Sequence, residues 1–139
     1  RYEIEKQLFN GELTVKELPK AWNTMFQEWF GEEVPNDRLG CLQDIHWSMG
    51  AFGYFPTYTL GNLYAAQLLE SMAEELGDID ALVESGDWSP LLEWLRPRIH
   101  AEGSKFSPAD LIEKATGAPP SPEPFLRYVE EKYGRIYGL

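Results

Sequence analysis

Residues 14–31 read Thr-Val-Lys-Glu-Leu-Pro-Lys-Ala-Trp-Asn-Thr-Met-Phe-Gln-Glu-Trp-Phe-Gly. Apolar side chains recur in this stretch at intervals of three and four, the period of one helical face. They are Val15, Leu18, Trp22, Met25, Phe26, Trp29 and Phe30. Residues 14–17 have the form of a capping box, Gly31 is a typical helix stop, and Pro19 lies close enough to the start to be tolerated. The stretch therefore predicts an amphipathic helix.

The rest of the chain shows the same period. Caps and prolines mark helix starts at Asp78, Ser89, Ser107 and Ser121, and Pro97 predicts a kink or break. Runs of alternating β-branched residues are nearly absent, which argues against strands. We expect an all-α fold of six or seven helices, the longest over residues 60–76, with the others near 2–9, 79–84, 91–99, 108–116 and 122–136.

Composition limits the class of protein. The chain has 139 residues, 43% of them hydrophobic, and no internal repeat or long linker, so we read residues 1–139 as one helical segment. Its net charge of -11 disfavours nucleic acid and anionic membranes as partners. A lone cysteine, Cys41, excludes an internal disulfide and fits a reducing cytoplasm. The start at Arg1, within a predicted helix, is expected to be a cut end.

Residues 40–58, the motif loop, differ from everything else in the chain. They read Gly-Cys-Leu-Gln-Asp-Ile-His-Trp-Ser-Met-Gly-Ala-Phe-Gly-Tyr-Phe-Pro-Thr-Tyr, and they gather an amide, a carboxylate, one of only two histidines and two phenols. This is the composition of a site wall. Taken alone, the same residues also fit a structural reading: His46 as a buried histidine, Tyr54 and Tyr58 as core aromatics, Asp44 as a turn cap. Cys41 fits a small buried hydrophobe better than a nucleophile.

The pattern Gly-x-x-Gln-Asp-x-His-Trp at residues 40–47, continuing into Phe-Gly-Tyr-Phe-Pro-Thr-Tyr-x-Leu-Gly-Asn, closely resembles the C-terminal signature of the carboxypeptidase Taq family of thermostable zinc metallocarboxypeptidases. The similarity continues through Ile99-His100-x-x-Gly103, Ala115-Thr116-Gly117 and Lys132-Tyr133. It implies that these residues form part of a larger helical, two-lobed metallopeptidase and contribute one wall of its cleft. It also implies that the intact protein releases amino acids from peptide C-termini.

The family holds zinc with a His-Glu-x-x-His helix and a downstream glutamate, which precede this region. Here the only histidines are His46 and His100, too far apart to pair on one helical face. The resemblance therefore implies a C-terminal segment that lacks the metal-binding half, binds no zinc alone and is inactive alone. Its implied partners are a peptide substrate, the missing N-terminal half of the same enzyme and a second copy, because dimers are common in the family.

In the wider group of helical zinc peptidases, a histidine and a tyrosine about twelve residues apart stabilise the tetrahedral intermediate. The resemblance assigns these catalytic roles to His46 and Tyr58, with Tyr54 as a substitute that also contacts substrate. Gln43 is expected to face the substrate main chain, and Asp44 to orient His46 or to tie down the loop. The alternative is a stand-alone acidic helical binding module without catalytic activity.

Overall fold

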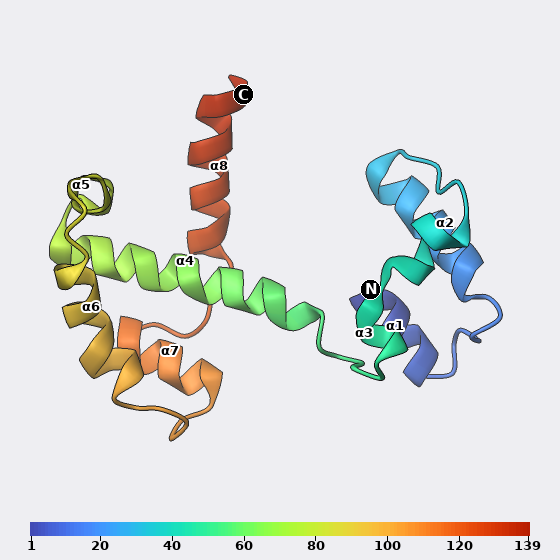
Figure 1. Ribbon diagram of the computed structural model, residues 1–139, viewed down its shortest axis with the longest axis horizontal. Helices are drawn as coiled ribbons and strands as arrows, with labels where there is room; N and C mark the ends of the chain where they lie inside the picture. Colours follow the sequence, from blue (N-terminus) through green and yellow to red (C-terminus); the bar gives the residue numbers. More distant parts are fainter. The chain divides into compact units, whose positions relative to one another are not determined.

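The computed structural model describes all residues 1–139 and contains helices but no strands (Figure 1). The all-α prediction is confirmed, but the predicted number is wrong, because there are eight α-helices. The additional helix is the single turn α3, inside the motif loop. The helices are α1 (Tyr2–Phe9), α2 (Leu18–Phe30), α3 (Ile45–Ser48), α4 (Pro56–Leu76), α5 (Ile79–Ser85), α6 (Ser89–Leu95), α7 (Pro108–Thr116) and α8 (Glu123–Tyr137).

The chain forms two compact units, Arg1–Thr59 and Leu60–Leu139. Unit 1 holds α1 to α3 and the first residues of α4, and unit 2 holds the rest of α4 and α5 to α8. The division falls inside α4, which continues through it without a break, so no linker in the sequence marks it. The place of residues 1–139 as one segment of a longer enzyme stays a prediction.

In unit 1, α2 begins at Leu18, three residues later than its apolar period predicts. Glu17 does reach back to the Thr14 amide at 3.0 Å, as in a capping box. The intervening residues form a tight turn instead of a helix, because Pro19 has no N–H and its ring would clash with the carbonyl four residues earlier. The predicted apolar face is present, yet no residue of α2 is buried.

A short connection of two 3₁₀ turns, η1 (Asp37–Leu39) and η2 (Cys41–Gln43), leads from α2 to the motif loop. Gly40 joins the two turns in a crowded position, where a Cβ would lie 2.7 Å from the Val34 side chain. The first glycine of the motif is therefore required by close approach. Next to it, Cys41 is buried, and the other deeply buried apolar residue of unit 1 is Ile4 of α1.

In unit 2, two of the predicted caps are confirmed. Asp78 accepts a hydrogen bond from the Ala81 amide at 3.0 Å, and Ser107 accepts one from the Asp110 amide at 3.2 Å. The Ser89 cap is wrong: Ser89 is the first residue of α6, and Asp87 accepts the bond from its amide. The break at Pro97 is confirmed, since α6 gives way to a π-helical turn, η3 (Arg96–His100).

The core of unit 2 contains a buried amide. Its apolar members are Met72, Trp94, Ile112 and Ala115. Gln67, only 4% exposed, lies among the buried residues of α4 and holds the connector between α7 and α8. This proline-rich connector is therefore tied to α4 by a tertiary contact.

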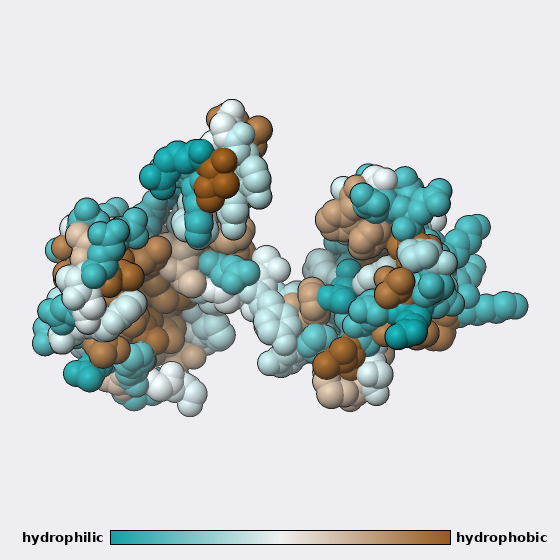
Figure 2. Space-filling model, turned by 45° about the horizontal axis from the view of Figure 1, so that its top comes forward, coloured by the Kyte–Doolittle hydropathy of each residue, from teal (hydrophilic) through white to brown (hydrophobic).

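Both units present apolar side chains among charged ones (Figure 2). On α2, Trp29 is 60% and Phe30 66% exposed. Patches of this kind mark contact surfaces more often than free surface. No helix combines the length and the low polarity that crossing a bilayer requires.

Candidate functional site

The motif loop folds by local rules. The Asp44 carboxylate accepts a hydrogen bond from the Trp47 amide at 2.7 Å, and this cap starts α3. Gly50 and Gly53 both have positive φ, which lets the chain turn back on itself. Pro56 then opens α4. In consequence α3 presents His46 and the first turn of α4 presents Tyr58 to the same place.

His46 and Tyr58 meet directly. The imidazole Nε2 lies 3.3 Å from the Tyr58 hydroxyl, although twelve residues separate them in sequence. One of the two groups donates and the other accepts. Tyr58 is 52% exposed and the His46 side chain 15%, so solvent reaches the pair mainly at the phenol. The structure thus brings together the two residues predicted to be catalytic, while their roles stay predictions.

Aromatic rings fix the imidazole. Tyr54 stacks on His46 at 5.6 Å between ring centroids and 20° between planes. Phe55 and Tyr58 present their edges, at 5.4 and 5.8 Å. Offset and edge-to-face contacts of this kind restrict ring rotation. Tyr54 also meets Tyr58 edge-on, and its role as a substitute donor stays a prediction.

Asp44 lies behind this cluster and is wholly buried. Its second carboxylate oxygen is 2.7 Å from the Arg1 Nε, and the Arg1 guanidinium stands 4.0 Å above the Phe55 ring. The oxygen that caps α3 is 3.7 Å from the His46 Nδ1, which is beyond hydrogen-bond distance. Both predicted tasks of Asp44, tying the loop and facing His46, are compatible with this geometry.

Gln43 has a structural contact. Its side-chain amide donates to the Arg38 carbonyl, across the η1 to η2 corner, and the side chain is otherwise exposed. The predicted contact with the substrate main chain stays a prediction.

Glu5 of α1 was not anticipated from the sequence. Its side chain is 4% exposed, and its two oxygens accept hydrogen bonds from the Trp47 indole and from the Gly53 amide. A signal was present, because Glu5 stands three and four residues before Leu8 and Phe9, on the apolar face of α1. A carboxylate in such a position is buried only when it has partners.

The chain does not assemble a metal site. No group of three or more His, Cys, Asp or Glu side chains is placed to hold a metal ion. The two histidines belong to different units, and burial together with the charge of Asp37 raises the pKa of the Cys41 thiol. The residues present therefore do not fit a metal centre.

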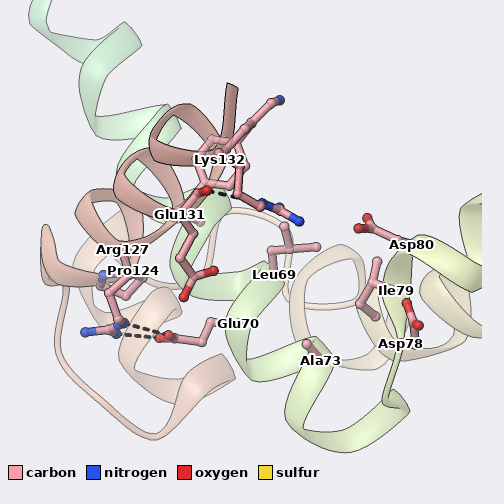
Figure 3. A pocket seen from close by; sticks show the side chains of 13 residues that line it. Leu69, Glu70, Ala73, Asp78, Ile79, Asp80, Pro124, Arg127, Glu131 and Lys132 are labelled. Carbon is pink, nitrogen blue, oxygen red and sulfur yellow. Dashed lines mark hydrogen bonds and ion pairs between the residues drawn. The ribbon is translucent and has the colours of Figure 1, made fainter. Parts of the chain in front are cut away.

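A separate hollow of about 490 Å³ lies in unit 2, between α4, the start of α5 and α8 (Figure 3). Acids and bases share its lining, and two of them, Arg127 and Glu70, form an ion pair at 2.8 Å. It contains no histidine, cysteine or serine. The chemistry of the motif loop has no counterpart there.

The comparisons with known proteins agree along nearly the whole chain. The family model described as Carboxypeptidase Taq (M32) metallopeptidase matches residues 1–133. The chain is 49% identical over 138 residues to thermostable carboxypeptidase 1 of Thermus thermophilus and 43% identical over 139 residues to carboxypeptidase 1 of Bacillus subtilis. The first match includes 99% of this chain but 27% of the Thermus protein, and the second includes 100% of this chain but 28% of the Bacillus protein.

Solved structures of carboxypeptidases are also similar to this chain over nearly its whole length. The M32 carboxypeptidase of Deinococcus radiodurans R1 is similar with a TM-score of 0.94 and 35% identity, over 99% of this chain and 28% of that one. Metallocarboxypeptidase 1 of Trypanosoma cruzi is similar with a TM-score of 0.90 and 41% identity, over 95% and 28%. The chain thus spans about a quarter of the length of the proteins that it matches.

Proposed function

Because this chain belongs to the carboxypeptidase Taq (M32) family of metallopeptidases, we propose that it is the C-terminal part of an enzyme that releases amino acids singly from the C-termini of peptides. In this proposal unit 1 supplies one wall of the active-site cleft, and the wall stabilises the tetrahedral intermediate. The proposal also holds that the segment alone is inactive, because the metal ligands belong to the rest of the enzyme.

One observation carries the assignment: the His46 Nε2 and the Tyr58 hydroxyl converge within 3.3 Å. An imidazolium and a phenol can each donate a hydrogen bond that strengthens as negative charge develops on the scissile carbonyl oxygen. The Asp44 carboxylate lies 3.7 Å from the His46 Nδ1, the ring nitrogen that does not meet Tyr58. Tyr54, which stacks on the imidazole, is assigned to contact with the substrate.

The family name implies a metal. We propose zinc as that metal and place its ligands in the rest of the enzyme, which this chain does not include. We also propose a cytoplasmic location, on the lone buried cysteine, and self-association of the intact enzyme. Gln43 is assigned to the substrate main chain, since it lies at the edge of the motif loop with an exposed side chain.

The test uses the intact enzyme with Tyr58→Phe and His46→Ala. Loss of one oxyanion donor lowers kcat by roughly 10²–10³-fold. Each variant should show a loss of this size with unchanged metal content, measured with a blocked dipeptide substrate and by atomic absorption.

Two matched variants serve as controls. Tyr2→Phe removes the hydroxyl of an exposed tyrosine of unit 1, and His100→Ala removes the second imidazole of the chain. Both should keep wild-type kcat. Wild-type kcat in Tyr58→Phe would return that residue to a structural role, and loss of metal in His46→Ala would identify it as a ligand.

A further inference from the structure

We propose that Glu5 of α1 is a positioning residue for the His46 and Tyr58 pair, acting by holding the motif loop at two points with one carboxylate. The inference rests on the proposed function for its catalytic consequence and on the geometry of unit 1 for its structural part. Glu5 touches neither member of the pair and is therefore not a catalytic residue.

The contacts join residues far apart in sequence. Glu5 Oε1 accepts from the Trp47 indole Nε1 at 2.7 Å, across 42 residues, and Oε2 accepts from the Gly53 backbone N at 2.9 Å, across 48. The carboxylate is 4% exposed. Water competes little for these bonds at a buried site, so they are stronger than surface hydrogen bonds.

The two anchored positions flank the residues that must be placed. Trp47 follows His46 directly on α3, and Gly53 precedes Tyr54, whose ring stacks on the imidazole. Between the anchors the chain turns at Gly50 with φ of 72°, and Gly53 itself has φ of 74°. Glycines in such turns allow many other conformations. A clamp across the turn is what selects the single conformation that brings Tyr58 to His46.

Only a carboxylate can do this at the site. Each of its two oxygens accepts a hydrogen bond from a different donor. A glutamine of the same shape has one acceptor oxygen and one NH₂, so it satisfies one donor and sets its own donor against the other. Glu5→Gln is therefore a near-isosteric change that releases one end of the loop.

Glu3 provides the matched control. It lies on the same helix, its side chain is 44% exposed, and its only partner is the surface lysine Lys6 at 3.0 Å. Glu3→Gln changes charge by the same amount and breaks no bond to the motif loop. Any effect of net charge on the enzyme appears in both variants, whereas loss of positioning appears in Glu5→Gln alone.

The first measurement is steady-state kinetics of the intact enzyme. Displacing catalytic groups by about 1 Å can cost roughly 10²-fold in rate. We expect kcat to fall about 10- to 100-fold in Glu5→Gln, with KM within about twofold and metal content unchanged, and Glu3→Gln to match the wild type. In a Tyr58→Phe background the same Glu5→Gln change should lower kcat by less than about twofold, because residues that act as a unit are not additive. Wild-type kcat in Glu5→Gln, or a full multiplicative effect in the Tyr58→Phe background, overturns the proposal.

The second measurement is hydrogen–deuterium exchange of the peptide covering residues 50–55. Release of the Gly53 amide should speed exchange there at least about tenfold in Glu5→Gln, with global melting temperature and Glu3→Gln exchange close to wild type. If Tyr58→Phe and His46→Ala both keep wild-type kcat, the proposed function fails. The exchange rate of residues 50–55 alone then shows whether Glu5 holds the motif loop. Unchanged exchange at residues 50–55 overturns it.

Discussion

Gln67 offers a direct test of how unit 2 is held together. The side chain is 4% exposed on α4 and joins that helix to the connector after α7. Its Nε2 lies 3.1 Å from the Thr116 hydroxyl and from the Ala118 and Pro119 carbonyls, and its Oε1 accepts from the Ser121 amide at 3.0 Å. Gln67→Leu keeps most of the volume and removes every one of these bonds.

The magnitude follows from the chemistry of the amide. An NH₂ has two hydrogens, so its three acceptors share two donated bonds, and the accepted bond makes a third. A hydrogen bond contributes about 1 kcal/mol net, and buried partners left without a bond cost more. We therefore expect Gln67→Leu to lower the free energy of unfolding by about 2–4 kcal/mol.

The assay is urea unfolding followed by circular dichroism, joined to amide exchange read residue by residue. The midpoint should fall at unchanged slope, and the Ser121 amide should lose protection. Gln27→Leu is the matched control: Gln27 is an exposed position on α2, and its change should stay within about 0.5 kcal/mol. A loss below about 1 kcal/mol in Gln67→Leu, or a Ser121 amide as protected as in the wild type, would refute the reasoning.

Three further predictions concern the chain as it stands. The purified 139-residue chain should bind zinc no more tightly than about micromolar and hydrolyse no peptide; stoichiometric zinc that survives dialysis contradicts this. It should self-associate at tens of micromolar in light scattering through the exposed apolar face of α2, and Trp29→Ser with Phe30→Ser should restore a monomer; an already monomeric wild type contradicts this. The hydrogen bond from Lys114 lowers the pKa of Glu102, and the charges of Lys114 and Lys105 lower it further. The ionised Glu102 therefore stabilises the fold above the ordinary carboxyl pKa. This stabilisation is lost as the pH falls through the lowered pKa of Glu102. Lys114→Met should raise the pKa of Glu102 toward its ordinary value in a ¹³C titration, and an unchanged titration contradicts the assignment.

Most helix ends were predicted from local sequence signals, namely glycine stops and capping residues. Gly31, with positive φ, ends α2 as predicted, and Asp78 and Ser107 cap the helices that follow them. Errors arose where two local signals competed. At the start of α2 the capping box and Pro19 conflict, and the proline prevails; before α6, Asp87 and Ser89 compete for one cap, and Asp87 prevails.

The candidate site was predictable only in part. The motif loop identified His46, Tyr54 and Tyr58 as a group, because glycines, a histidine and phenols occur together nowhere else in the chain. The partners that fix them come from the first helix. Arg1 and Glu5 carry no motif of their own, and their bonds to Asp44, Trp47 and Gly53 span more than forty residues.

Sequence alone determined the helical class, most boundaries and the residues of the motif loop, since periodicity, caps and glycine stops depend on neighbours within a few positions. Tertiary structure alone decided the contact of His46 with Tyr58, the burial of Glu5 and Gln67, and the apolar face of α2 that remains open. The physical reason is that a buried polar side chain is stable only where distant segments supply its hydrogen-bond partners, and no local pattern records which segments will meet.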